Sequence, residues 1–285
     1  MKLSPVKEAN RLSQILDAFH LTHGLDRYPV DVPSLALDCA NFFKFADPIK
    51  AVQAADIKGF EGGLFKTSAD SWTMLYNSGL SSPGRVRFTQ AHELGHYLLH
   101  RYQRESFQCT SDDMLDWSAH EKSIESEADK FSSYLLMPLH DFRRQVADTI
   151  SFEVLGHCAD RYGVSLTAAA LQWISYTEEK AVLVMSRDGF MKWAWSSDSA
   201  IKSGAYFATR RNTVPIPDHS VAANASIRHE RVGATVSAKA WFPHADENAT
   251  LREMKVSADQ YDSVLTLLIL PRSLDVWPPK EWAAE

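Results

Sequence analysis

The pentapeptide HELGH, residues 92–96, places two histidines four positions apart, with a glutamate directly after the first. On an α-helix, residues four apart lie one above the other on the same face. His92 and His96 can therefore bind one tetrahedral Zn²⁺, with each imidazole nitrogen at about 2.0–2.1 Å. Glu93 can reach a water molecule at that metal and act as its general base. The pattern indicates a metal-dependent hydrolase.

The residues around this pentapeptide supply the context that so short a pattern requires. Ser82 and Pro83 resemble an N-cap and a first helical position, and they predict a helix that extends to about Arg101. Residues 62–67 and 72–77 are rich in β-forming side chains around a polar turn. They predict two strands directly before the metal-binding helix.

A catalytic zinc site needs a third protein ligand and one open position. The segment ESEAD, residues 125–129, falls on a predicted second helix. Glu125 can meet the first helix across the metal. Asp129, one turn later on the same face, can accept the free N–H of a ligating histidine. The alternative for Glu125 is a solvated charge on an acidic helix.

His100 is another candidate for the third ligand, because it lies four residues after His96. By that position a straight helix has turned about 80° from His92, at 3.6 residues per turn. One tetrahedral ion cannot easily use all three histidines, so we interpret His100 as a packing residue or as a neighbour of the ligands. The donor that stabilises the oxyanion is left open between Tyr97, Tyr134 and His100. The strand at 72–77 is expected to pair with an extended substrate.

Cys109 lies in the loop expected between the two metal-binding helices. A thiolate there can reach the zinc as an inhibitory fourth ligand and keep the enzyme latent until the loop moves. The alternative is a free cysteine packed under the loop. The other two cysteines, Cys39 and Cys158, form no CxxC pair with it, so reduced thiols are expected.

Composition is that of an ordinary soluble protein. The 285 residues are 45% hydrophobic and 23% charged, with a net charge of −6. No apolar run approaches the roughly 20 residues of a membrane helix, and residues 1–10 lack the apolar segment of a signal peptide. We expect no membrane association and a cytoplasmic location.

The helix–strand pattern predicts a mixed α+β chain with two domains, 1–178 and 179–285. The first includes a helical pair at residues 152–176, which resembles a helix-turn-helix. Its second helix has no basic residue and only Gln172 to read a base, so we interpret the pair as packing helices. DNA reading by these helices is the alternative.

The second domain is expected to be mostly β and combines aromatic and basic side chains. Single-stranded nucleic acid is bound by this combination, because stacking tolerates any base. Tryptophans in a core with charges in water are the alternative. The residues concerned are Trp193, Trp195, Arg210, Arg211, Arg228, Arg231 and Lys239.

Three segments in order, HELGHYLLH (92–100), ESEAD (125–129) and FSSYLLMP (131–138), resemble the ImmA/IrrE family of metallopeptidases. The resemblance covers residues 5–176. Members are similar to thermolysin-type zincins in their metal ligands, and they regulate bacterial gene expression by cutting partner proteins, usually helix-turn-helix repressors.

The resemblance implies a zincin-like, gluzincin-type domain that holds Zn²⁺. His92, His96 and Glu125 would be its ligands, Glu93 the base, and Asp129 the hydrogen-bonding neighbour of a ligand. No other cofactor is implied.

The β-rich part after residue 178 resembles the sensor domain of the CapP-like branch, whose peptidases accompany anti-phage defence systems and respond to DNA damage. The sequence thus predicts a regulatory zinc endopeptidase that cleaves a repressor after a stress signal, with single-stranded DNA as the candidate activator. The alternative is a non-proteolytic regulator that holds zinc structurally and binds a partner protein or DNA. An intact Glu93 favours the enzyme, because a structural site needs no base.

Overall fold

The computed structural model describes residues 3–56, 59–80, 82–109, 124–146, 149–258 and 262–278. The chain forms two compact units. The first comprises Met1–Gln145 with Cys158–Ser165, and the second comprises Val146–His157 with Leu166–Glu285. Both units mix helices with one sheet each, which confirms the predicted α+β class. None of the helices in the described ranges has the length and apolar character needed to cross a membrane.

The sheet of the first unit has the strand order β1-β3-β2-β4. β1 runs parallel to β3, and the other two pairs are antiparallel. The predicted strands around the polar turn are confirmed as β2 and β3. The bounds are β1 Ile49–Ala55, β2 Gly62–Ser68, β3 Ser71–Asn77 and β4 Ser106–Cys109.

Strand β3 lies between β1 and β2, so neighbouring strands already use both of its edges. The expectation that residues 72–77 pair with an extended substrate is therefore wrong. The reason is that β1, which is rich in alanine, was not recognisable as a strand that covers this edge. In the described part of the sheet, β1 and β4 are the outer strands.

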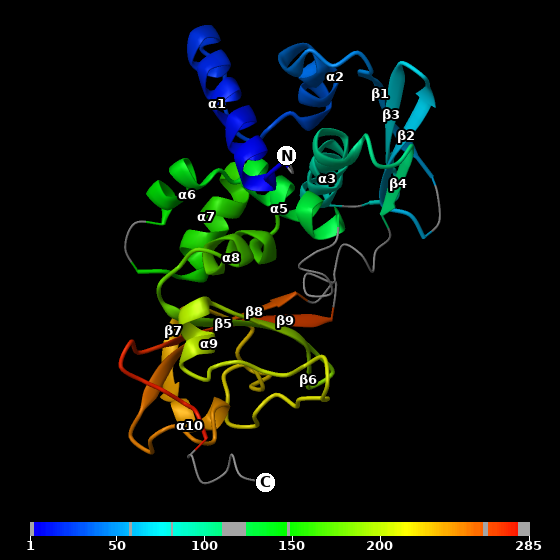
Figure 1. Cartoon of the computed structure of the whole chain (residues 1–285). Helices are drawn as coiled ribbons and strands as arrows, with labels where there is room; N and C mark the ends of the chain where they lie inside the picture. Colours follow the sequence, from blue (N-terminus) through cyan, green and yellow to red (C-terminus); the bar gives the residue numbers. More distant parts are fainter. Residues whose placement is uncertain are drawn as a thin grey trace. The chain divides into compact units, whose positions relative to one another are not determined.

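Helix α3 (Pro83–His100) packs between this sheet and α5 (Ile124–Leu136), as Figure 1 shows. It begins as predicted, with Ser82 in an extended conformation before Pro83. From Phe88 onward nearly all of its side chains are buried, so this helix forms the centre of the unit. The other helices of the unit are α1 (Pro5–His23), α2 (Val32–Phe43) and α6 (Leu139–Gln145).

A glycine makes the close approach of α3 and α5 possible. A Cβ atom built on Gly95 would lie 3.2 Å from the Cα of Ala128 and 3.0 Å from the ring of Phe131. Such distances are tighter than ordinary van der Waals contact, so the small residues at 95 and 128 let the two backbones meet. The histidines of one helix thereby come within reach of the acidic residues of the other.

The second unit contains an antiparallel five-stranded sheet with the order β6-β5-β9-β8-β7. Its strands are β5 Lys180–Arg187, β6 Phe190–Ser196, β7 His229–Ser237, β8 Thr250–Ala258 and β9 Ser263–Leu270, and its helices are α8 Leu166–Ile174, α9 Asp198–Lys202 and α10 Ala238–Trp241. Helix α7 (Phe152–Tyr162) contributes residues to both units. Strand β7 ends at Ser237, and α10 follows it directly.

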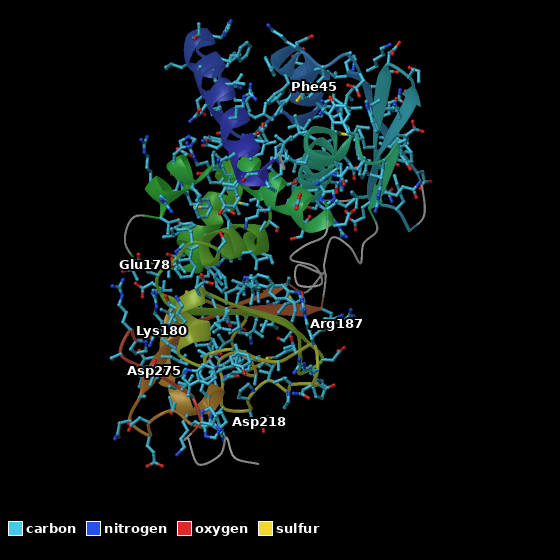
Figure 2. The ribbon with its side chains drawn as sticks, viewed as in Figure 1. Phe45, Glu178, Lys180, Arg187, Asp218 and Asp275 are labelled. Atoms are coloured by element: carbon cyan, nitrogen blue, oxygen red, sulfur yellow. The ribbon has the colours of Figure 1, made fainter. Side chains whose placement is uncertain are left out.

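One face of this sheet is covered by an apolar core that includes Val182, Leu268 and Trp241. Strand β8 also buries two charged residues. Glu253 accepts hydrogen bonds from the Ala222 amide and the Trp241 indole, at 2.6 and 2.9 Å. The Lys180 ammonium lies 2.9 Å from the Asp275 carboxylate. Figure 2 labels both residues.

Candidate metal centre

Three potential ligand atoms from α3 and α5 lie close together. The Nε2 atoms of His92 and His96 lie 2.9 Å apart, and Glu125 Oε2 lies 3.1 Å from the first and 3.2 Å from the second. Both histidines are buried, and the Glu125 side chain is 30% exposed. The structure thus brings together the three residues that the sequence proposed as ligands.

The protonation states of this group suit a cation. Burial lowers the pKa of His96 to about 4, so its imidazole is neutral at pH 7. Burial raises the pKa of the Glu125 carboxyl, but the contacts with His92 and His96 lower it more, so the pKa lies below its ordinary value. Neutral imidazole and ionised carboxylate are the forms that bind metal.

The distances also fit a tetrahedral ion. With metal–ligand bonds of about 2.0–2.1 Å, two ligand atoms in a tetrahedron lie about 3.3 Å apart. The three observed separations, 2.9 to 3.2 Å, are only slightly shorter. The donor set of two imidazoles and one carboxylate is that of a catalytic zinc site with one position open.

Asp129 lies beside the first histidine, where the sequence placed it. Its Oδ1 atom is 2.8 Å from His92 Nδ1. A carboxylate only accepts hydrogen bonds, so His92 carries its proton on Nδ1 and leaves Nε2 available.

Glu93 is fully buried beside the start of β2. Its Oε1 atom is 3.2 Å from the position of a Cβ built on Gly62, and the methyl of Thr89 is 2.3 Å from that position. Any larger residue at 62 would displace the carboxylate or the helix beneath it. Gly62 therefore shapes the space in which the candidate base lies.

Two contacts of the site could not be predicted from the residues that neighbour the ligands in the sequence. The ring of Phe107, on β4, stacks on His96 with centroids 4.5 Å apart and an angle of 16° between the planes. Glu127 Oε2 lies 3.2 Å from His100 Nε2. Both partners are distant along the chain, so helical spacing could not identify them.

Other predicted roles are only partly addressed by the structure. Cys109 ends β4 opposite Gly62, but its side chain lies outside the described residues, and its role as a fourth ligand stays a hypothesis. The Tyr97 hydroxyl donates to the carbonyl of Asp47 at 2.9 Å, so its proton is already used away from the metal centre. Tyr134 is half-buried, and the oxyanion donor stays unassigned.

The match to a known family covers this centre. Residues 50–173 match the family model of the IrrE N-terminal-like domain. The matched segment contains both α3 and α5, and therefore all three candidate ligands. The chain is similar over this segment to the ImmA/IrrE family that the model describes, whose members are generally zinc metallopeptidases and regulators of repressors. No curated protein matches the chain.

The matched segment covers the first unit from residue 50 onward and part of the second unit. The residues that resemble a CapP-like sensor, 179–285, all follow the matched segment. The family therefore supports the peptidase chemistry of α3 and α5, whereas the role of the five-stranded sheet stays a prediction.

Proposed function

We propose that this chain is a zinc-dependent endopeptidase with a zincin-like catalytic domain. The observation that carries the proposal is the convergence of His92, His96 and Glu125 within one IrrE N-terminal-like domain, with Glu93 buried next to the first ligand. A purely structural metal site would have no use for a buried carboxylate at that position.

Zinc at this centre would supply a Lewis acid that activates a water molecule and polarises the scissile carbonyl. Glu93 would take a proton from that water and deliver it to the leaving amine. Asp129 holds the His92 ring, and Phe107 covers the His96 ring, so neither imidazole has to reorient during the reaction.

The proposed substrate is a helix-turn-helix repressor, cleaved after DNA damage or a related stress. Support comes from the family, whose members regulate repressors. A cytoplasmic location and a place in anti-phage defence belong to the same proposal.

The second unit is proposed to act as the sensor of that signal, with single-stranded DNA as its ligand. The five basic side chains Arg210, Arg211, Arg228, Arg231 and Lys239 are exposed, and Trp193 and Trp195 are half-exposed on the outer strand β6. Exposed basic side chains can bind the phosphates of single-stranded DNA, and aromatic side chains can stack on its bases.

Comparison of new protein N-termini across the proteome tests the proposed activity. The cells would express either wild type or Glu93→Gln, with and without a DNA-damaging agent. We expect a damage-dependent N-terminus inside a small helix-turn-helix protein with wild type alone. Identical N-termini in both strains would favour the alternative, a regulator that binds zinc and a partner without cleaving it.

Polarisation of a labelled oligonucleotide tests the sensor. Full-length protein should bind a single-stranded 20-mer with an affinity that falls as salt rises, and Arg210→Ala/Arg211→Ala should weaken it. Binding that is unaffected by salt or by the double substitution would contradict this part of the proposal.

A further inference from the structure

A chain of buried polar contacts leads away from the metal centre through the Nδ1 atom of His96. His96 Nδ1 lies 3.2 Å from His100 Nδ1, and His100 Nε2 lies 3.2 Å from Glu127 Oε2. The two histidines are 0% and 1% exposed, and the Glu127 side chain is 16% exposed. Three side chains from two helices thus form one sheltered row.

The carboxylate at the end of the row determines where each proton lies. Glu127 only accepts hydrogen bonds, so His100 must carry a proton on Nε2. A buried imidazole is neutral and has a single N–H, so His100 Nδ1 is an acceptor. The proton between the two Nδ1 atoms therefore belongs to His96.

We propose that Glu127 and His100 position His96 as a metal ligand by fixing its proton on Nδ1. His96 Nε2 is then bare and directed at the cluster with His92 and Glu125. The inference rests on the proposed zinc site and adds two positioning residues to it.

The two ligating histidines are thus held in the same tautomer by different means. For His92 a carboxylate acts directly, since Asp129 is 2.8 Å from Nδ1. For His96, the Glu127 carboxylate acts through the His100 imidazole. Partners of this kind orient the ligand ring and raise its basicity, and their loss typically costs about 10–100-fold in metal affinity.

His100 is not placed to act as a ligand itself. Its Nδ1 atom faces the Nδ1 of His96, whereas the ligand atoms converge on the Nε2 side of that ring. The group of potential ligands found among the described residues contains His92, His96 and Glu125, without His100.

Substitutions of His100 can distinguish a role in positioning His96 from a role in packing alone. His100→Phe keeps a ring of similar size but accepts no hydrogen bond. His100→Asn places an amide oxygen close to the former Nδ1 and restores the acceptor. His140→Phe is the matched control, because His140 contacts Asp17 on a different part of the unit.

Zinc affinity of the full-length protein would be measured by competition with a chromogenic chelator at pH 7.5. We expect His100→Phe to lose about 10–100-fold, and His100→Asn and the control to stay within a few fold of wild type. Glu127→Leu should lose less zinc affinity than His100→Phe. The double variant should bind zinc no more weakly than His100→Phe alone, because Glu127 affects His96 only through His100. Full zinc affinity in His100→Phe would overturn the proposal and leave packing as the role of His100.

Nitrogen-15 NMR of the imidazole rings reads the tautomer directly and needs no zinc. Metal-free wild type should show His96 protonated on Nδ1, and Glu127→Leu, which leaves position 100 intact, should populate the Nε2–H form as well. An unchanged tautomer in Glu127→Leu would contradict the inference. A wild-type protein with the expected tautomer but no zinc binding would instead contradict the proposed function, so the two failures can be distinguished.

Discussion

Replacing Gly95 by alanine has two opposing effects on the stability of the folded protein, one from helix propensity and one from packing. Alanine in a helix interior is favoured over glycine by about 0.5–1 kcal/mol. Here, however, the new methyl would lie 3.0 Å from the Phe131 ring and 3.2 and 3.3 Å from backbone atoms of Ala128. Overpacking of this kind costs about 1–3 kcal/mol. We expect a net loss of stability of up to about 2.5 kcal/mol.

The same substitution at Gly156, in α7, provides the matched control. There the nearest atom to an added Cβ, on Arg231, is 4.0 Å away, so only the gain in helix propensity remains. Chemical denaturation of the metal-free protein should show Gly156→Ala stabilised by about 0.5–1 kcal/mol. It should show Gly95→Ala destabilised.

The packing at position 95 also affects metal binding. A methyl at position 95 pushes α5 away from α3 and with it Glu125, so zinc affinity should fall in Gly95→Ala and stay unchanged in Gly156→Ala. If both variants gained the same stability and bound zinc equally well, the proposed close approach of the two helices would be refuted.

Two further predictions concern the base and the thiols. Gly62→Ala should keep zinc but lose most cleavage, because the added Cβ would lie 2.3 Å from the Thr89 methyl and 3.2 Å from Glu93 Oε1, so the side chains around the base must shift; normal turnover with bound zinc would contradict this. Burial raises the pKa of Cys39 to about 12 and of Cys158 to about 11, so at pH 8 neither thiol should react with an alkylating reagent before the protein unfolds. Alkylation of the folded protein would then report on Cys109 alone, and its protection by zinc would support the latent-enzyme hypothesis, whereas equal labelling with and without zinc would argue against it.

The sequence predicted those features of the site that depend on residue spacing within a single helix. A capped helix with histidines four residues apart fixes their common face, and Glu125 and Asp129 have the same spacing on the next helix. The bounds of α3 were predicted to within a few residues, and residues 125–129 were correctly placed on a second helix, α5. The positions of the candidate ligands followed from these two helices.

Features that depend on distant partners were missed. Strand β8 carries Glu253 and Lys255 into the interior, which hides the alternation of a strand, and their partners Ala222, Trp241 and Asn224 lie far away along the chain. For the same reason Glu127, which helical spacing directs away from Glu125, was not expected to contact His100. The spacing of residues along one helix or strand cannot predict a contact with a residue on another element.

The zinc content of the purified chain tests the metal centre most directly. Wild type, Glu93→Gln and Glu125→Ala would be stripped with a chelator, supplied with zinc, desalted and measured by inductively coupled plasma mass spectrometry. We predict about one zinc per chain in wild type and in Glu93→Gln, and much less in Glu125→Ala, which lacks one ligand. A folded wild type without zinc, or a Glu125→Ala variant that retains the full amount, would contradict the assignment.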